Sequence, residues 1–552
     1  MFGKRKRKID YSSFYAKYKD YQFTVLKYLF SIIISFLTLK TTGNLLYVII
    51  PLLELIIIFL VSNFIIKKNQ IIGCFINNLF ILFYNVEILV LFFGNSFVTL
   101  IMLNNLSSWE ALKGRIFIFG LGIVLLLTFS FLPTKYVETQ NKITYYLYKY
   151  NVVSLFLLSA ALTLNLSLGG FFGFKYSPGK SVYDLAVAEY DYIQLIQKAE
   201  RESTEKKKLF YKEEVGDFIK KPKNIPEKPN VILIFTEGMS QHIIDDERNI
   251  TPNIKELQSK SLNFSNYYNH TFATYRGIIG QLYSGYQLDN SDQNHLISLQ
   301  SILKKEGYHT SFINTEAHNE EFTSYLNHLG FDSVLDAQPS KGEDSTFDKD
   351  AYKELNKLMS NQPDGQPFFI SMYTFGTHIG MNSFDKKYSD GNDRLLNRFY
   401  DLDIQFGKFI EKFNNSKYSE NTILVFTTDH ATYVDDEYRK SFPNQSRGMG
   451  NLDKVPFFIY YKGVDPQILD VQGQNSVNLT PTILDYLDIS RENYFLGNSL
   501  FANKEYRTVF SSLFVSELTY ASTSDAVVRY LSKHEEEKME TYIVDYYSSA
   551  RW

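Results

Sequence analysis

The chain has 552 residues, of which 45% are hydrophobic and 16% aromatic, and its formal net charge is -3, from 57 Lys and Arg against 60 Asp and Glu. This balance excludes a nucleic-acid-binding protein that is recruited by bulk positive charge. The single cysteine, Cys74, excludes an intrachain disulfide framework, a cysteine-rich zinc site and a CxxC redox pair. Any metal ion would therefore have to be held by histidine, carboxylate and hydroxyl groups.

Five apolar segments follow a basic amino terminus. They are residues 22–39, 44–66, 71–93, 115–132 and 152–173. Each has about 18–23 residues, the length that an α-helix needs to cross roughly 30 Å of hydrocarbon. A signal peptide has a single short apolar region, so five segments exclude that interpretation. We therefore expect a five-helix transmembrane region over residues 1–173.

Lysine and arginine residues predict the orientation of these spans. The basic residues cluster in residues 1–8, at Lys67 and Lys68, and at Lys135, Lys142 and Lys149. Placing these segments in the cytoplasm puts everything after residue 173 outside. The sequence thus predicts a multi-pass protein of the cell membrane, with a cytoplasmic amino terminus and an extracytoplasmic carboxyl-terminal part.

Two acidic residues, Glu54 and Glu87, lie within the expected second and third spans. Charged side chains are costly in hydrocarbon and usually face the protein interior or water. These two either line a path for lipid headgroups or form hydrogen bonds between helices near the interface. The second arrangement is the commoner one.

Residues 174–229 form an expected linker. Gln197–Lys221 is dense in lysine and glutamate, with acids and bases three or four residues apart, as on a solvated helix. Pro222, Pro226 and Pro229 end this stretch. The linker therefore separates the membrane region from a different kind of domain.

From residue 230 onward, short β-branched and aromatic runs alternate with amphipathic stretches. The runs are Val231–Phe235, Thr310–Ile313, Pro367–Met372, Thr422–Phe426 and Pro456–Tyr461. Apolar strands that alternate with helices indicate a mostly parallel sheet covered by helices on both faces. We expect this α/β domain to cover residues 230–505, followed by a carboxyl-terminal tail, 506–552, in which no motif is apparent.

Polar residues directly follow four of these predicted strands. They are Glu237, the stretch from Asn314 to His318, His378, and the pair Asp429 and His430. Ligands of open α/β sheets bind beyond the carboxyl ends of the strands. Oxygen donors with one imidazole suit a divalent ion, Mn²⁺ being favoured, with Zn²⁺ or Mg²⁺ as alternatives. By itself the Asp-His pair is a weak signal, because such a pair is more often a loop cap beside a surface imidazole than a metal site.

Seven further patterns occur in a fixed order between residues 230 and 490. They are Asn230–Glu237, Thr251-Pro252-Asn253, Phe264–Gly277 with Tyr283–Tyr286, Gly307–Phe312, Asn327–Asp332, Thr428-Asp429-His430 and Val455–Tyr460. This ordered set resembles the sulfatase-like phosphotransferases of the alkaline phosphatase superfamily. Within them it is most similar to the lipoteichoic acid synthases and related phosphoglycerol transferases, which also have five spans and an outward domain.

The resemblance implies that Glu237, Thr274, Asp429 and His430 hold one metal ion and that Thr274 is the nucleophile. Thr271, three residues earlier, is a competing choice. Thr274 is preferred because Arg276 and Gly277 give it the family's "T-x-R/K-G" continuation. The alternative role for Thr274 is an ordinary helix N-cap.

The resemblance also implies residues that contact the substrate. His378 resembles the family's substrate-facing histidine and is expected to be catalytic, its alternative being a loop histidine bonded to backbone. Glu316 and His318 lie where the family places substrate contacts, although the residue types differ here. Arg276 and Arg447 are candidates for bidentate phosphate contacts, or are simply exposed.

Cysteine and histidine usage narrows the choice within this superfamily. The "C/S-x-P-x-R" motif of true sulfatases does not follow Thr274, and after His430 only His534 remains for a second metal. Phosphoethanolamine transferases share the one-metal site but typically carry several disulfides outside the membrane. Because this chain has no cysteine after Cys74, they are the second choice.

We therefore expect an enzyme that transfers glycerol phosphate from phosphatidylglycerol through a phosphothreonine intermediate. The expected acceptor is an extracytoplasmic glycan, glycolipid or polyglycerolphosphate chain, as in lipoteichoic acid. Alternatives are a phosphoethanolamine transferase, a phosphohydrolase of the same fold, or a non-catalytic membrane assembly partner. No nucleic acid partner is expected.

Overall fold

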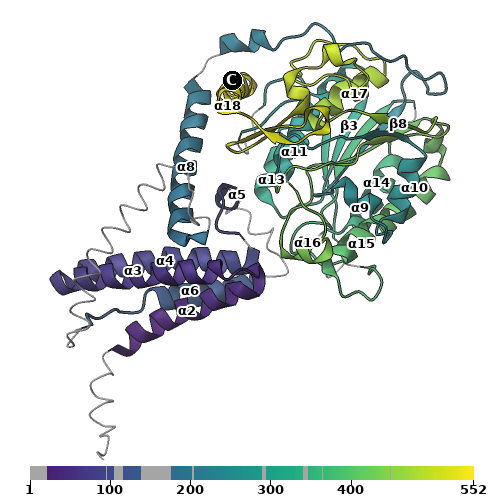
Figure 1. The fold of residues 1–552 in the computed structure, drawn as a ribbon. Helices are drawn as coiled ribbons and strands as arrows, with labels where there is room; N and C mark the ends of the chain where they lie inside the picture. The colour runs from purple at the N-terminus through teal and green to yellow at the C-terminus, as the bar shows by residue number, and fades with distance from the viewer. Residues whose placement is uncertain are drawn as a thin grey trace, which may run out of the picture. The chain divides into compact units, whose positions relative to one another are not determined.

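A computed structural model of the chain describes residues 21–137, except 95 and 105–115, and residues 176–551, except 202–203, 289–293, 340–345, 364, 384 and 448. The chain forms two compact units. The membrane unit comprises Met1–Ser107 and Arg115–Tyr190, and the catalytic unit comprises Ser108–Gly114 and Asp191–Trp552. Both are drawn in Figure 1.

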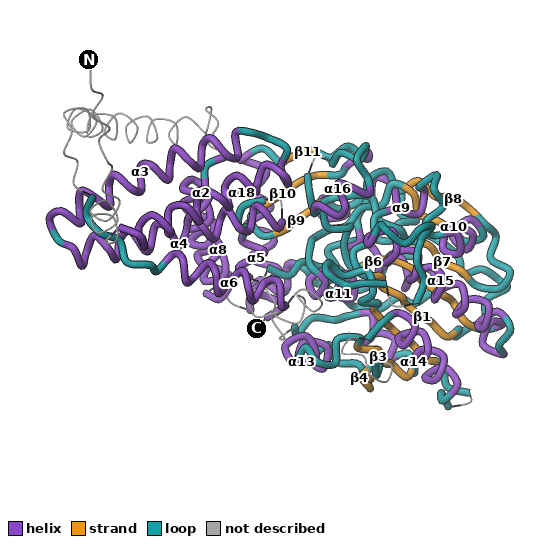
Figure 2. The backbone as a smooth tube through the Cα atoms, turned by 90° about the horizontal axis from the view of Figure 1, so that it is seen from below, coloured by secondary structure: helices purple, strands orange, loops and turns teal. Residues whose placement is uncertain are grey.

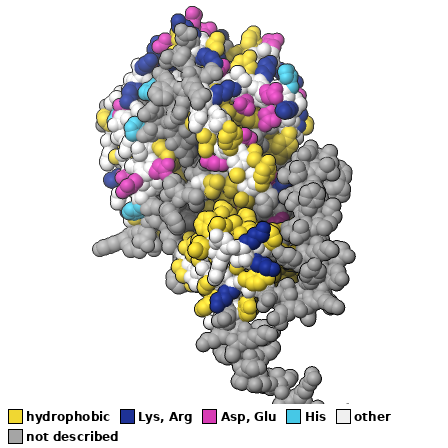
Figure 3. All heavy atoms as spheres, turned by 90° about the vertical axis from the view of Figure 1, so that its left-hand side faces the viewer, with side chains coloured by type: hydrophobic (Ala, Val, Ile, Leu, Met, Phe, Trp, Pro, Cys, Tyr) yellow, Lys and Arg dark blue, Asp and Glu magenta, His cyan; other side chains and the backbone are white. Residues whose placement is uncertain are grey.

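The membrane unit contains three helices long and apolar enough to cross a membrane among the residues described. They are α2 (Gln22–Thr42), α3 (Leu46–Lys68) and α4 (Gln70–Gly94), which pack side by side, as Figures 1 and 2 show. Figure 3 shows hydrophobic side chains over this unit, with a few basic ones among them.

The expected count of five spans is therefore not reproduced: three candidate spans are found. Within the fourth expected span, 115–132, the described residues form α6 (Ile116–Ser130). The fifth expected span, 152–173, lies outside the described residues, as do residues 1–8, Lys142 and Lys149. The short helix α5 (Leu100–Asn104) precedes α6, and α8 (Pro178–Arg201) begins in this unit.

Polar side chains join the membrane helices to one another. The Lys27 ammonium on α2 is buried and donates to Asn77 Oδ1 at 3.0 Å and to Thr134 Oγ1 at 2.9 Å. Asn85 on α4 accepts from Ser31 at 2.8 Å and donates to Ser130 at 2.9 Å. Such interhelical hydrogen bonds replace water as the partner of polar groups inside a bundle.

An eight-stranded sheet forms the centre of the catalytic unit, with strand order β4-β3-β5-β1-β6-β7-β2-β8. The strands are β1 (Asn230–Thr236), β2 (Leu262–Ser265), β3 (His309–Asn314), β4 (Ser333–Asp336), β5 (Phe368–Tyr373), β6 (Thr422–Thr428), β7 (Phe458–Tyr460) and β8 (Gln467–Asp470). Every pair is parallel except those that β7 makes with β6 and β2. The predicted α/β domain with a mostly parallel sheet is confirmed.

Helices cover both faces of this sheet because alternate residues of each central strand point to opposite sides. Val231, Leu233 and Phe235 of β1 belong to one hydrophobic core, and Ile232 and Ile234 belong to the other. The first core contains α11 (Thr274–Tyr283), α12 (Leu299–Lys305), α13 (Glu320–Asn327), α17 (Leu479–Tyr486) and α18 (Lys533–Arg551). The second contains α9 (Gln241–Asp245), α10 (Pro252–Ser259), α14 (Asp348–Ser360), α15 (Arg394–Asn414) and α16 (Asp436–Ser441).

The carboxyl-terminal residues, in which the sequence shows no motif, fold against the domain. They form a three-stranded antiparallel sheet of β9 (Leu513–Ser516), β10 (Thr519–Ser522) and β11 (Arg529–Tyr530), and then α18. The Val515 N–H donates to the carbonyl of His270 at 2.9 Å, and the Tyr286 hydroxyl donates to the carbonyl of Leu513 at 2.6 Å. These bonds attach the segment to the residues that directly precede and follow α11 in the chain.

Short 3-10 helices complete the catalytic unit. They are η4 (Thr204–Leu209), η5 (Lys417–Glu420), η6 (Ser476–Asn478), η7 (Lys504–Tyr506), η8 (Val509–Ser512) and η9 (Ser524–Ala526). Between η4 and β1 the chain runs along the domain surface, where Lys212 exchanges two backbone hydrogen bonds of 2.9 Å with Asn493. Phe210, Val215 and Ile225 of this stretch are buried in the first core.

Candidate active site

Glu237 and Asp429 meet because they follow the last residues of two neighbouring parallel strands. Thr236 of β1 lies opposite Thr428 of β6 in register, so the next residue of each strand emerges at the same edge of the sheet. One ligand atom from each of Glu237, Asp429 and His430 lies within 4.8 Å of the others. All three side chains are buried.

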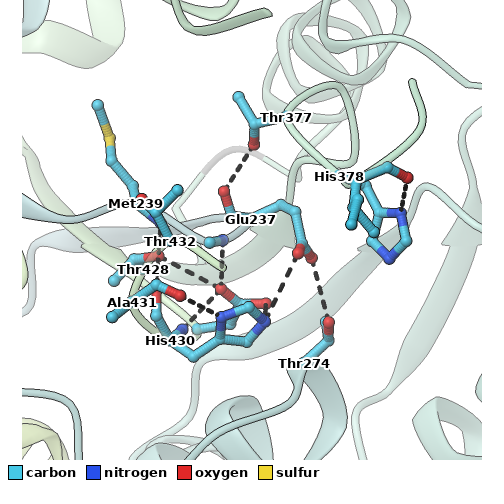
Figure 4. Close-up of polar contacts among 12 residues, drawn as sticks. Glu237, Met239, Thr274, Thr377, His378, Thr428, His430, Ala431 and Thr432 are labelled. Carbon is cyan, nitrogen blue, oxygen red and sulfur yellow. Dashed lines mark hydrogen bonds and ion pairs between the residues drawn. The ribbon is translucent and has the colours of Figure 1, made fainter. Parts of the chain in front are cut away.

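The Glu237 carboxylate and the His430 ring point toward one another, with the Thr274 hydroxyl on the other side of the carboxylate (Figure 4). Asp429 Oδ1 accepts the N–H groups of Gly238 at 2.8 Å and His430 at 2.7 Å, whereas Oδ2 has no hydrogen-bond partner among the described residues. His430 Nδ1 donates to the carbonyl of Ala431 at 2.8 Å, which leaves Nε2 as the ring nitrogen that faces the carboxylates. Nε2 is 3.5 Å from both Glu237 Oε1 and Asp429 Oδ2.

These contacts fit a divalent cation. Burial and the neighbouring charge of Asp429 raise the pKa of Glu237 well above its usual value. Two buried carboxylates beside an imidazole lone pair repel one another unless positive charge lies between them. Glu237, Asp429 and His430, with the Thr274 hydroxyl, are therefore the residues that would hold the ion.

Thr274 begins α11, and its hydroxyl donates to Glu237 Oε2 at 3.1 Å. The N-cap position belongs to Ala273, not to Thr274, and Ala273 has φ 87°, a region that a non-glycine residue rarely adopts. The competing Thr271 is buried, and its carbonyl accepts from the Asn269 side chain at 2.7 Å. The turn before α11 thus directs the Thr274 hydroxyl, rather than a capping group, at the carboxylates.

Gly277 allows α11 to lie directly against the end of β6. A Cβ atom at Gly277 would overlap the carbonyl oxygen of Asp429. One turn later, Gln281 Nε2 donates to the carbonyls of Gly277 at 3.1 Å and Thr428 at 2.9 Å. The glycine of the "T-x-R-G" pattern is therefore explained by close packing of the helix that carries Thr274 against a candidate metal ligand.

His378 lies on the loop after β5, to one side of the cluster in Figure 4. Its Nδ1 is 2.9 Å from the carbonyl of Ile379, and its ring stacks on Phe375 with 4.7 Å between ring centroids. Burial lowers the pKa of His378 to about 4. The imidazole is thus neutral at physiological pH, with a lone pair on Nε2.

Asp348, which the sequence analysis did not single out, holds this loop. Its Oδ1 accepts the N–H of Gly376 at 2.9 Å, and a Cβ atom at position 376 would overlap its carboxylate. Thr377 anchors the other side of the loop by donating to the carbonyl of Glu237 at 2.6 Å. Burial raises the pKa of Asp348 to about 7.

The two arginines proposed for phosphate contact are both engaged inside the protein. Arg276 is buried and lies 2.6 Å from Glu517 Oε1, in the turn between β9 and β10. Arg447 lies 2.9 Å from Asp453 Oδ2 and donates to the carbonyl of Thr432 at 2.6 Å. Arg276 thus attaches the carboxyl-terminal sheet to α11, and Arg447 fixes the loop after His430.

The other two substrate candidates lie in different surroundings. Glu316 accepts from the Tyr373 hydroxyl and from Asn319 Nδ2, the latter at 3.1 Å, and its charge contributes to the raised pKa of Glu237. His318 is exposed. Glu316 therefore lies near the cluster, whereas no contact in the described structure links His318 to it.

Residues 229–489 match the Sulfatase family model. This stretch is similar to the sulfatase family. Lipoteichoic acid synthase 2 of Bacillus subtilis is 24% identical over 343 residues, which cover 54% of this chain and 52% of that protein. Phosphoglycerol transferase I of Escherichia fergusonii is 24% identical over 461 residues, which cover 75% of this chain and 54% of that protein. The chain thus spans about half the length of these relatives.

Among solved structures, an integral membrane protein from Neisseria meningitidis, lipooligosaccharide phosphoethanolamine transferase A, has the same fold. It matches with a TM-score of 0.52 over 87% of this chain and 97% of its own, at 13% sequence identity. The resemblance that the motifs predicted is confirmed: the sulfatase-like domain has relatives named as lipoteichoic acid synthase and phosphoglycerol transferase.

Gly277→Ala should disturb the packing of the site, although the substitution adds only one methyl group. The new methyl group must displace Asp429 or tilt α11, and such overpacking costs about 1–3 kcal/mol. We expect a lower thermal unfolding midpoint together with a reduced metal content, measured by elemental mass spectrometry. Gly450→Ala is the matched control, because a Cβ atom there meets nothing within 4 Å. Equal behaviour of the two variants would contradict the close-packing argument.

The Asp348→Asn variant should lose part of the pH dependence of stability. The pKa of Asp348 is raised to about 7 in the folded protein. Its contribution to folding stability is therefore fully present below the pKa that it has in the unfolded chain, and is lost as the pH rises through 7. We expect the thermal midpoint of the native protein to fall between pH 5 and pH 8, relative to the variant, by the equivalent of roughly 1–4 kcal/mol. Asp245→Asn, at an exposed position, should leave the slope unchanged. Parallel slopes for the native protein and Asp348→Asn would refute the assignment.

The purified full-length protein should contain about one equivalent of a divalent metal, as a single site implies. Asp429→Ala should remove it, because that substitution deletes a carboxylate whose Oδ2 has no other partner. Glu316→Gln should retain it, since Glu316 lies outside the three-residue cluster. Two equivalents, or one that survives Asp429→Ala, would show that the ligand set is different.

Proposed function

We propose that the protein is a membrane phosphotransferase that moves glycerol phosphate from phosphatidylglycerol to a hydroxyl acceptor outside the cytoplasm. The acceptor class is a glycan, glycolipid or polyglycerolphosphate chain. One observation carries the proposal: the Thr274 hydroxyl, at the start of a helix, donates to Glu237 within the buried cluster of Glu237, Asp429 and His430. The names of the two curated relatives support glycerol phosphate as the group transferred.

In the first proposed step, Thr274 Oγ1 forms a bond to the phosphorus of the donor, and the bond from phosphorus to the diacylglycerol oxygen breaks. The hydroxyl proton leaves along its hydrogen bond to Glu237 Oε2, and diacylglycerol takes up a proton from water. The amino-terminal N–H groups of α11 favour the negative phosphate. A bound divalent ion, Mn²⁺ in our proposal, with Zn²⁺ or Mg²⁺ as alternatives, supplies charge that makes the hydroxyl more acidic and offsets that of the phosphate.

In the second step, an acceptor hydroxyl attacks the phosphothreonine, and the bond between Thr274 and phosphorus breaks. The Thr274 oxygen regains a proton, while His378 takes the proton of the acceptor on Nε2. His378 suits this role because its Nδ1 faces the carbonyl of Ile379 and its lowered pKa keeps the ring neutral. Thr274 and His378 are thus the proposed catalytic residues.

The proposed organisation follows the sequence analysis. Residues 1–173 anchor the chain in the membrane, 174–229 form the linker, and 230–505 carry out the chemistry outside the cytoplasm. Residues 506–552 brace α11, a role supported by the ion pair between Arg276 and Glu517. The donor lipid is thereby available at the leaflet next to the catalytic domain.

Thr274→Ala tests this function directly. Loss of a nucleophile should lower the release of diacylglycerol from phosphatidylglycerol by at least about a thousandfold. The fold should remain, because the Thr274 side chain does not cap its helix. Product analysis by mass spectrometry, with fluorescent phosphatidylglycerol and phosphatidylethanolamine compared, measures both the rate and the donor.

Thr271→Ala is the matched control, because Thr271 lies three residues earlier, in the turn before α11. It should keep activity within a few-fold of the native protein. With donor but no acceptor, the phospho-alcohol should be found on the peptide that contains Thr274. Normal turnover by Thr274→Ala would refute the mechanism, and an adduct on Thr271 would move the nucleophile by one turn.

A further inference from the structure

One face of α8 carries a stripe of exposed apolar side chains. Tyr183, Val187, Tyr190 and Ile193 are spaced four, three and three residues apart, which places them on one side of a helix. Their exposed fractions are 53%, 40%, 63% and 41%. The opposite side is covered, since Leu195 and Ala199 are buried in the first core of the catalytic unit. We call these four residues the apolar stripe.

The first turn of α8 is bound to two membrane helices. Glu54 on α3 accepts the N–H of Gly179 at 2.9 Å and the Ser177 hydroxyl, and Glu87 on α4 accepts the Ser181 hydroxyl at 3.1 Å. Carboxylates at a helix amino terminus satisfy its free N–H groups and interact favourably with its dipole. The two acids found within the spans are therefore the anchor of α8.

This anchor fixes the depth of α8 in the membrane unit. Glu54 lies eight residues beyond the start of α3, and Glu87 lies seven residues before the end of α4. At 1.5 Å per residue, the first turn of α8 lies about 10–12 Å from those helix ends. Helices that lie in the bilayer interface bury their apolar face to about 5–10 Å.

The direction of α8 and its surroundings agree with this depth. Figure 1 shows the first half of α8 running across the axes of α3 and α4, as a helix in the plane of the bilayer does. On α3, which carries Glu54, the apolar side chains of Leu46, Ile49 and Leu53 are exposed, as on a surface that faces lipid. Tyrosine is enriched at this level of membranes because its ring is apolar and its hydroxyl reaches the headgroups.

We propose that α8 is an interfacial helix whose apolar stripe inserts into the bilayer at the ends of α3 and α4 that carry Leu46 and Gly94. In the orientation proposed above, this is the outer leaflet. The second half of α8 packs in the catalytic unit, where the Tyr192 hydroxyl donates to the carbonyl of Leu288. This inference rests on the membrane helices and not on the transfer chemistry.

The charges of α8 indicate whether it discriminates between neutral and anionic lipid headgroups. Asp184, Asp191 and Lys198 are exposed at one edge of the apolar stripe, so the exposed charge is nearly balanced. Helices recruited by anionic lipids instead carry an excess of lysine and arginine. The stripe should therefore insert equally well into neutral and anionic bilayers.

Depth measurements on the full-length protein test the proposal. Single cysteines at positions 183, 187 and 190, in a Cys74→Ser background, would carry an environment-sensitive fluorophore in phosphatidylcholine vesicles. Lipids brominated in the acyl chains should quench these three labels at least twofold more than labels at the control positions Asp191 and Lys198. The same ratio is expected when a third of the lipid is phosphatidylglycerol.

Two results would overturn the proposal. Equal quenching at stripe and control positions would place the stripe in water. Fluorescence that is high without bromine quenching, and that rises with the protein-to-lipid ratio, would indicate a second copy of the chain as the partner. Because the readout needs no turnover, it gives its answer whether or not Thr274 is the nucleophile.

Discussion

The Glu237 and Asp429 carboxylates are buried side by side because β1 and β6 are parallel neighbours in register and each acid directly follows its strand. No rearrangement of side chains alone can separate them, since both backbones are fixed by the sheet. The site therefore favours a positive charge, and burial beside Asp429 raises the pKa of Glu237. The other contacts of the site hold further groups around these two neighbouring carboxylates.

The support comes from elements that are far apart in the chain. The strained Ala273 turn brings the Thr274 hydroxyl to Glu237, and Gly277 lets α11 lie against the backbone of Asp429. The ion pair between Arg276 and Glu517 then joins α11 to the carboxyl-terminal sheet. A residue two positions from the proposed nucleophile is thus held by a segment outside the matched family region, which ends at residue 489.

The membrane unit uses acids in a different way. Glu54 and Glu87 are satisfied by the amino terminus of α8, so charges that would be costly in hydrocarbon fix the helix that leads to the catalytic unit. A phosphotransferase that takes its donor from a bilayer needs its domain near the headgroups. An anchored interfacial helix meets that need without any contact between the domain and a specific lipid.

The sequence by itself determined the central strands, the order of the motifs and the residue types of the candidate metal cluster. β1, β3, β5 and β6 are predicted because strands buried on both faces read as continuous apolar runs. β2, β4 and β8 have four residues each, too few for a periodic pattern, and went unpredicted.

Only the tertiary structure decided which charged groups are available to a ligand. The sequence offered Arg276 and Arg447 as phosphate contacts, but Glu517 and Asp453 bind them, and these pairings depend on packing between segments rather than on local pattern. The roles of Asp348 and of the carboxyl-terminal sheet were likewise invisible, because neither lies in a motif. Local sequence specifies which elements form and what they carry, whereas the distances between charges arise only when the elements are packed together.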